Sequence, residues 1–163
     1  MKRKILIISG VILLLAAVAG IFYWFSDRRK LEVMLDDTEH LITKPESSSP
    51  HDGVLKYAGT DKIFADQVVI ICDDPKISMT LTNEELRGYL ASLHRQVRSL
   101  QVKTLERTFQ IHGDSAELNF TVEISCVTAN GKTEHELRPV TGKAVKKDGR
   151  WLISGLHIKS AAK

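Results

Sequence analysis

Apolar and polar residues alternate along much of the second half of this chain. From Ala116 to Cys126 every second residue is apolar, which predicts a strand with one buried face and one wet face. Three turn signals separate long runs of this kind, namely Gly113-Asp114, Asn130-Gly131 and Asp148-Gly149. Asn-Gly and Asp-Gly favour tight hairpins because the central positions of these turns take positive φ. The pattern predicts a strongly bent antiparallel meander with strands over residues 100–111, 116–126, 132–147 and 150–158.

Three of these strands contain residues that predict a local irregularity or a position in the sheet. The apolar positions of the first strand shift parity between Val102 and Leu105, which predicts a β-bulge. Pro139 predicts an edge position or a bulge in the third strand, because proline cannot donate to a ladder. The last strand is apolar on both faces and is expected at the centre of the sheet or covered on both sides.

Apolar residues recur with helical spacing before the meander. Residues 31–42 follow this spacing and Pro45 ends the run. A second helix is predicted over residues 83–99, where Thr82 and Glu85 can form a capping box. Its apolar stripe, expected to face the core, is Leu86, Leu90, Leu93, Val97 and Leu100. Its polar side is basic and is expected to face water, with Arg87, His94, Arg95 and Arg98.

The pattern is weaker between these two helices. Residues 46–53 predict a flexible polar linker, and residues 54–65 a helical segment of poor periodicity. Residues 68–72 predict a short buried strand, closed by Asp73-Asp74-Pro75. The fold expected from these elements is α+β, with a curved antiparallel sheet wrapped on about three helices as a cone or roll.

The chain opens with an uncharged apolar segment. Residues 5–25, after a basic tail at residues 1–4, are long enough to cross the hydrocarbon core of a bilayer as a helix, and they end in interface-favouring aromatic residues. We therefore predict a single transmembrane anchor. A cleaved signal peptide is the alternative, since Ala17-Val18-Ala19 fits a small-x-small cleavage site. Basic residues flank both ends, but the short tail favours a cytoplasmic N-terminus and an extracytoplasmic domain.

Charge and cysteine content narrow the function classes. The 163 residues carry 23 Lys and Arg against 20 Asp and Glu, and Lys2, Arg3 and Lys4 account for the excess. The rest of the chain is neutral and gives no basis for nucleic-acid binding. Cys72 and Cys126 could pair in an exported domain, or they are two small buried hydrophobes. No zinc-ligand spacing occurs, so neither a metal nor a cofactor is predicted.

Three short segments resemble one superfamily. Residues 64–70 read FADQVVI, residues 113–118 read GDSAEL, and residues 147–153 read KDGRWLI. They resemble strand motifs of the nuclear-transport-factor-two-like superfamily, also called SnoaL-like or cystatin-like, over residues 31–158. The chain departs from the pattern at Leu81-Thr82-Asn83, where a Gly-Arg or Gly-Lys often precedes the third helix. The resemblance implies that residues 26–163 form a cone with a pocket, and its members include isomerases, dehydratases and domains with no chemistry.

No catalytic constellation stands out in the predicted cone. Enzymes of this superfamily need a base and a proton donor inside it, whereas the inner face of residues 116–126 has no ionisable group other than Cys126. Arg107 could point inward and bind an anion, or the bulge could turn it to solvent. His157 could be a base or a histidine satisfied by its neighbours, and His135 could approach it. The candidate ligand-binding residues are Arg107, Phe109, Phe120, His135 and His157.

Two functions remain open on these grounds. The first is a single-pass, membrane-anchored, exported module without catalysis, which binds lipid through its N-terminal helix and an envelope protein or a second copy through its surface. The second is a protein that binds a small apolar ligand in the cone, or an isomerase- or dehydratase-like enzyme. An open cone with convergent polar groups would favour the second function, and a filled cone the first.

Overall fold

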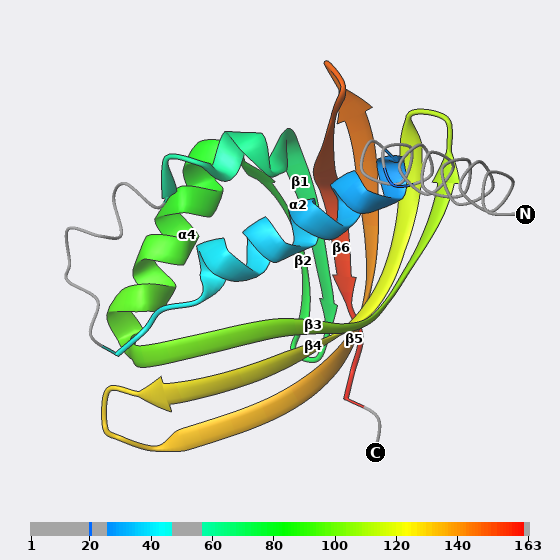
Figure 1. Ribbon diagram of the computed structural model, residues 1–163. Helices are drawn as coiled ribbons and strands as arrows, with labels where there is room; N and C mark the ends of the chain where they lie inside the picture. Colours follow the sequence, from blue (N-terminus) through cyan, green and yellow to red (C-terminus); the bar gives the residue numbers. More distant parts are fainter. Residues whose placement is uncertain (1–19, 21–25, 47–56, 162–163) are drawn as a thin grey trace, which may run out of the picture.

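The computed structural model describes residues 20, 26–46 and 57–161. The predicted anchor at residues 5–25, except Gly20, and the linker at residues 46–53, except Glu46, lie outside the described residues. In the ranges that are described, no helix has the length and apolar character needed to span a membrane. The domain is α+β, with two described α-helices and one curved six-stranded sheet (Figure 1).

Helix α2 (Asp27–Ile42) lies across the concave side of the sheet (Figure 1). Ser26 caps its start, since the hydroxyl accepts a hydrogen bond from the backbone N–H of Arg29 at 3.3 Å. The predicted apolar stripe is confirmed, and its buried residues are Leu31, Met34, Leu35, Thr38 and Leu41. After the helix, Lys44 pairs with Leu100 through two backbone hydrogen bonds, which ties the end of α2 to the sheet.

Helix α4 (Asn83–Gln96) begins with the predicted capping box. The Thr82 hydroxyl accepts from the N–H of Glu85, and the Glu85 carboxylate accepts from the N–H of Thr82. The helix ends before the predicted residue 99, because Val97 already belongs to the next strand. The predicted stripe was wrong at Leu93, which is 40% exposed, and the predicted wet side was wrong at His94, which is buried.

The segment between the helices differs most from the prediction. Of the predicted helical segment at residues 54–65, residues 54–56 lie outside the described residues and Tyr57 is helical. A 3-10 turn, η1 (Thr60–Lys62), follows, and strand β1 (Phe64–Asp73) starts inside the predicted helical range. β1 is twice as long as expected and forms a hairpin with β2 (Lys76–Thr82), a strand that was not predicted. The alternation of Ile77, Met79 and Leu81 with polar residues was the available signal for this strand.

The other four strands form the predicted meander. They are β3 (Val97–His112), β4 (Ser115–Thr128), β5 (Thr133–Lys147) and β6 (Arg150–Ile158). The spatial order is β2-β1-β6-β5-β4-β3, so β6 is central as predicted. The prediction of a purely antiparallel sheet was wrong, because β1 and β6 run parallel. Pro139 lies just beyond the β5–β6 ladder, which ends where Val140 meets Ile158. However, β5 runs between β4 and β6 and shows no register shift at this residue, so the predicted edge position or bulge was wrong.

Strand β3 contains the predicted bulge, displaced along the chain. The register with β4 shifts between Leu105 and Thr108 rather than between Val102 and Leu105. Glu106 there has a φ of 53°, an unusual backbone angle for a residue with a side chain. This bulge turns the neighbouring Arg107 toward α2, where it forms two ion pairs.

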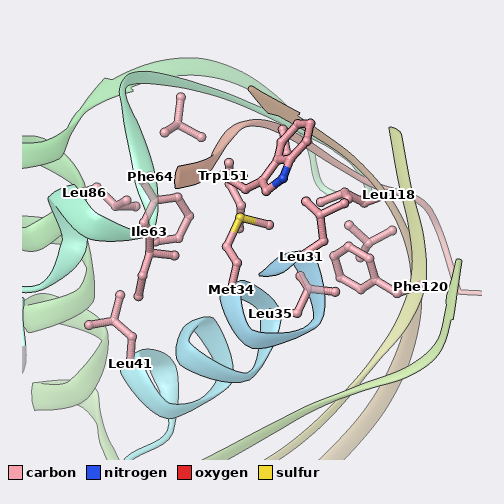
Figure 2. Close-up of a cluster of buried hydrophobic side chains, with 14 of the residues drawn as sticks. Leu31, Met34, Leu35, Leu41, Ile63, Phe64, Leu86, Leu118, Phe120 and Trp151 are labelled. Carbon is pink, nitrogen blue, oxygen red and sulfur yellow. The ribbon is translucent and has the colours of Figure 1, made fainter. Parts of the chain in front are cut away.

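The interior of the cone is filled by the protein's own side chains. Figure 2 shows Leu31, Met34 and Leu35 of α2 pointing toward side chains of the sheet. Leu118 and Phe120 of β4 meet them there, and so does Trp151 of β6, which is only 3% exposed. The buried face of β4 is confirmed for Ala116, Leu118 and Phe120. Both cysteines are free thiols and only half-buried, so neither a Cys72–Cys126 disulfide nor full burial is observed.

Candidate functional site

A pocket of about 370 Å³ opens beside the first turns of α2. One wall is the helix itself, and the others come from Lys62 of η1 and from the turn between β5 and β6. This turn carries positive φ at Asp148 (52°) and Gly149 (76°), as the Asp-Gly signal predicted. The lining residues are Arg29, Lys30, Val33, Met34, Asp37, Lys62, Gly149, Arg150 and Trp151.

A polar cluster holds this end of α2 against the sheet. Asp27 accepts a hydrogen bond from Nε1 of Trp151 at 3.1 Å and pairs with Nζ of Lys146 at 2.9 Å. The Lys146 ammonium also lies 5.7 Å from the centre of the Trp151 ring, a cation–π distance. The hydrogen bond from Lys146 lowers the pKa of the Asp27 carboxyl below its usual value, and the bond from Trp151 adds to this effect. The cluster fixes Trp151 as the inner wall of the pocket.

The pocket is rich in positive charge. Arg29 lies 3.3 Å from a carboxylate oxygen of Glu32, and Lys30 lies 3.9 Å from Asp27. Lys62 and Arg150 are exposed and form no ion pair or side-chain hydrogen bond with any described residue. Among the described residues that line the pocket, Asp37 is the single acidic one. Four cations therefore surround the opening, and two of them are available to an anionic ligand.

Arg107 is engaged by α2. Its guanidinium nitrogens lie 2.6 Å from the Asp36 carboxylate and 2.6 Å from the Glu39 carboxylate. Partial burial disfavours the charged form, but the two hydrogen-bonded carboxylates raise the pKa of Arg107 above its ordinary value. Glu39 also accepts from the backbone N–H of Thr104 at 2.6 Å. The arrangement fastens the middle of α2 to β3.

The two predicted histidines lie apart on the sheet. Nε2 of His135 is 3.0 Å from Glu123 on the neighbouring strand, and Nε2 of His157 is 2.9 Å from Asp73. The hydrogen bond from His157 lowers the pKa of Asp73. The expected approach of His135 to His157 is not formed, because His157 faces Thr141 on β5, roughly 20 Å along that strand from His135.

Phe109 and Phe120 belong to the core. Phe120 is 8% exposed and is part of the main buried cluster, against which the partly buried Phe109 packs. The five candidate ligand-binding residues therefore lie in three places: two in the core, one against α2 and two on the exposed sheet.

Sequence reasoning did not identify the residues of the basic pocket. Arg29 and Lys30 stood out only as charges that flank the apolar segment, and Lys62 and Arg150 carried no local signal. The long-range packing of α2 against β6 brings them together. Across the described ranges, no three His, Cys, Asp or Glu side chains are grouped closely enough to hold a metal ion.

A second polar contact was also missed. His94 of α4 is buried, and its Nδ1 is hydrogen-bonded to the Tyr57 hydroxyl. Its Nε2 lies 2.6 Å from the carbonyl oxygen of Ile42. A carbonyl oxygen only accepts, so Nε2 carries the proton and Nδ1 accepts from Tyr57. Burial raises the pKa of Tyr57, which keeps the hydroxyl protonated as a donor.

Comparison with known proteins rests on three-dimensional structure. No protein-family model and no curated protein sequence matches the chain. A protein from Kribbella flavida is similar with a TM-score of 0.71 at 12% identity, over 84% of this chain and 91% of its own. A protein from Novosphingobium aromaticivorans, proposed to be a scytalone dehydratase, has a TM-score of 0.65 at 13% identity over 83% and 85%.

A nuclear transport factor 2 (NTF2)-like superfamily protein from Salmonella enterica matches with a TM-score of 0.61. The identity is 16%, over 82% of this chain and 92% of the Salmonella protein. Identities this low carry information about the fold and not about activity. The described part of the chain therefore has the NTF2-like, or cystatin-like, cone fold that its strand motifs resemble.

Proposed function

We propose that this protein is a single-pass, membrane-anchored module of the NTF2-like fold that acts by binding rather than by catalysis. The observation that carries this proposal is the filled cone. Leu31, Leu35, Leu118 and Ile153 are at most 1% exposed and occupy the space in which an NTF2-like enzyme would need its substrate. A binding protein of this fold then works through its surface.

The ionisable groups support the same proposal. Proton abstraction needs a base in a dry pocket, close to a donor aimed at the developing oxyanion. The side chains of His135 and His157 are 53% and 40% exposed, and each contacts a surface carboxylate. Asp37, the one carboxylate of the pocket, is exposed to solvent.

Membrane anchoring is the second part of the proposal. It is supported by the uncharged length of residues 5–25 and by the aromatic end of that segment. The domain would lie outside the cytoplasm, where an envelope protein or a second copy of this chain is the expected partner. No nucleic acid is expected, since the domain is close to neutral.

The alternative is a protein that binds a small apolar ligand or acts as an isomerase or dehydratase. It is favoured by the similarity of the fold to the Novosphingobium protein. It would require the core around Phe109 and Phe120 to open and Arg107, His135 or His157 to reach the ligand. A substrate-dependent activity lost on replacing His135 or His157 by Gln would support this alternative over the first.

Fractionation of the full-length protein tests the anchor. We expect it to stay in the membrane pellet after alkaline carbonate washing, with Met1 still at its N-terminus. A product released from membranes that begins at Gly20 would contradict anchoring. Cys72 and Cys126 then test orientation, because both are partly exposed and the chain has no other cysteine. A membrane-impermeant maleimide should label right-side-out vesicles, and a Cys72→Ser/Cys126→Ser variant is the control for background.

A further inference from the structure

We propose that the basic pocket beside the start of α2 binds the phosphate of an anionic phospholipid headgroup. The pocket joins three elements that are distant in sequence, which are α2, η1 and the β5–β6 turn. It combines cations with an apolar wall, and it lies close in the chain to the segment proposed as the anchor. The inference rests on the proposed membrane anchor, because the anchor would bring the pocket to the lipid headgroups.

The charges suit a phosphate group. Arg150 can present a planar pair of N–H donors to two phosphate oxygens, while Lys62 acts as a compact point charge. Neither residue has an ion pair within the described part of the chain, so a ligand would not have to displace a partner. Arg29 and Lys30 add charge at the rim, although nearby Glu32 and Asp27 offset part of it. Asp37 opposes binding but is outnumbered.

The apolar wall favours a lipid over a free phosphate ion. Val33 is 41% exposed, and it lines the pocket together with Met34 and Trp151. An inorganic phosphate would leave this wall unused, whereas the glycerol and ester carbons of a phospholipid would cover it. The pocket volume of about 370 Å³ lies within the range of small-molecule sites.

Chain length places the pocket near the bilayer surface. Arg29 follows Phe25, the last residue of the apolar segment, by four residues. Four residues span at most roughly 14 Å even when fully extended. The headgroup layer extends roughly 5–8 Å beyond the hydrocarbon core on each side. With Phe25 at the membrane interface, the helical path that α2 takes from Asp27, at roughly 1.5 Å per residue, keeps Arg29 at the depth of the headgroups.

Lipid competition with the full-length protein in detergent tests the pocket. Native mass spectrometry would follow the retention of phosphatidylglycerol against phosphatidylcholine from an equimolar mixture. We expect the natural protein to prefer phosphatidylglycerol and a Lys62→Gln/Arg150→Gln variant to lose roughly tenfold of that preference. An Arg95→Gln/Lys103→Gln variant is the matched control, because it removes the same two charge types from exposed sites outside the pocket.

Three results would overturn the proposal, two from the lipid competition and one from a soluble competitor. One is an equal retention of both lipids by the natural protein. Another is an equal loss of preference in the control variant, which would indicate attraction to net charge alone. Glycerol 3-phosphate serves as the soluble competitor, and displacement at the concentration of the lipid itself would assign the pocket to a soluble anion instead. Far-UV circular dichroism verifies that the variants are folded.

This test can fail independently of the proposed function. Carbonate washing and N-terminal sequencing test the anchor and do not involve the pocket. Lipid competition in detergent tests the pocket whether or not the chain is anchored in cells. An anchored protein without lipid preference would contradict only the inference made for the pocket.

Discussion

The two ends of α2 are both fastened by polar side chains, but in opposite ways. At the first end, the charged pair of Asp27 and Lys146 is partly exposed, with 31% and 24% of the side chains accessible. At the second end, the hydrogen-bonded pair of His94 and Tyr57 is buried, with 8% of each residue accessible. The first end borders the basic pocket, whereas the second is closed further by Lys44, whose Nζ donates to two backbone carbonyls.

This difference separates a site that can bind from a contact that stabilises. Exposed ion pairs contribute little to stability, because water and salt screen them. The fold therefore does not depend on pairing every charge near the first end of α2, and unpaired cations there can bind a ligand. A buried hydrogen-bond network must instead have every group satisfied, because an unpaired group there is costly. The hydrogen-bonding groups at the second end of α2 are therefore used to stabilise the fold. At the first end, the cations Lys62 and Arg150 can bind a ligand.

The largest effect is expected at the first end, where Trp151 is the inner wall of the pocket and part of the core. Trp151→Ala should lower the free energy of unfolding by about 3–5 kcal/mol, because a large buried ring is lost. Urea unfolding of the full-length protein in detergent, followed by far-UV circular dichroism, measures this. Trp151→Phe is the control, since it keeps an aromatic ring in the core while it loses the Nε1 bond to Asp27 and part of the indole volume, so its loss should be smaller. A loss below about 1 kcal/mol for the alanine variant would mean that the ring is not a core residue.

A smaller loss is expected at the second end from Tyr57→Phe. The change removes the hydrogen bond between the Tyr57 hydroxyl and Nδ1 of the buried His94, which should cost about 1–3 kcal/mol. Tyr89→Phe is the matched control, because Tyr89 is 57% exposed on α4 and should change stability by less than about 0.5 kcal/mol. Equal effects of the two substitutions would remove the distinction between the two ends. Retention of phosphatidylglycerol should be unchanged in both variants.

The smallest effect concerns the pH dependence of the first end. The pKa of Asp27 is lowered in the folded protein, so its contribution to stability is present above the unfolded value, near 3.9, and is lost as pH falls through the folded value. Asp27→Asn should be slightly less stable than the natural protein at neutral pH, and the two stabilities should converge below about pH 4.

Thermal unfolding between neutral and acidic pH measures this convergence. Asp148→Asn is the control, because it removes an exposed carboxylate from the neighbouring turn, at a positive φ that Asn also tolerates. A constant difference between Asp27→Asn and the natural protein at every pH would show that the Lys146 contact does not depend on the carboxylate charge.

The parts of the fold that were predictable are those specified by near neighbours. The meander follows from alternation and from three turn signals, and α4 follows from Thr82 and Glu85 at its start. The parallel pairing of β1 with β6 has no such local signal, because these two strands are more than 70 residues apart in the sequence. This explains why the expected sheet was antiparallel. Strand β2 is a different case, because its alternation was a local signal and its partner β1 is its neighbour in the chain.

The candidate site depended even more on long-range contacts. Residue type placed His94 on the wet side of its helix, but two hydrogen-bond partners make its burial possible. Nothing in the local sequence distinguishes Lys62 and Arg150 from other surface cations. They line the pocket only because α2 packs against the sheet. The filled cone was one of the two expected outcomes, and choosing between them required the positions of Phe120 and Trp151.

The parallel pairing of β1 with β6 also sets the order in which this domain can assemble. Strands β3 to β6 are joined by short turns, whereas the second partner of β1, strand β6, is its neighbour in the sheet but is the last strand along the chain. During synthesis β1 and β2 can form their hairpin early, but the sheet stays in two pieces until residues 150–158 have left the ribosome. Until then the unpaired edges of β1 and β5 are exposed to other chains, so the nascent domain passes through an aggregation-prone stage.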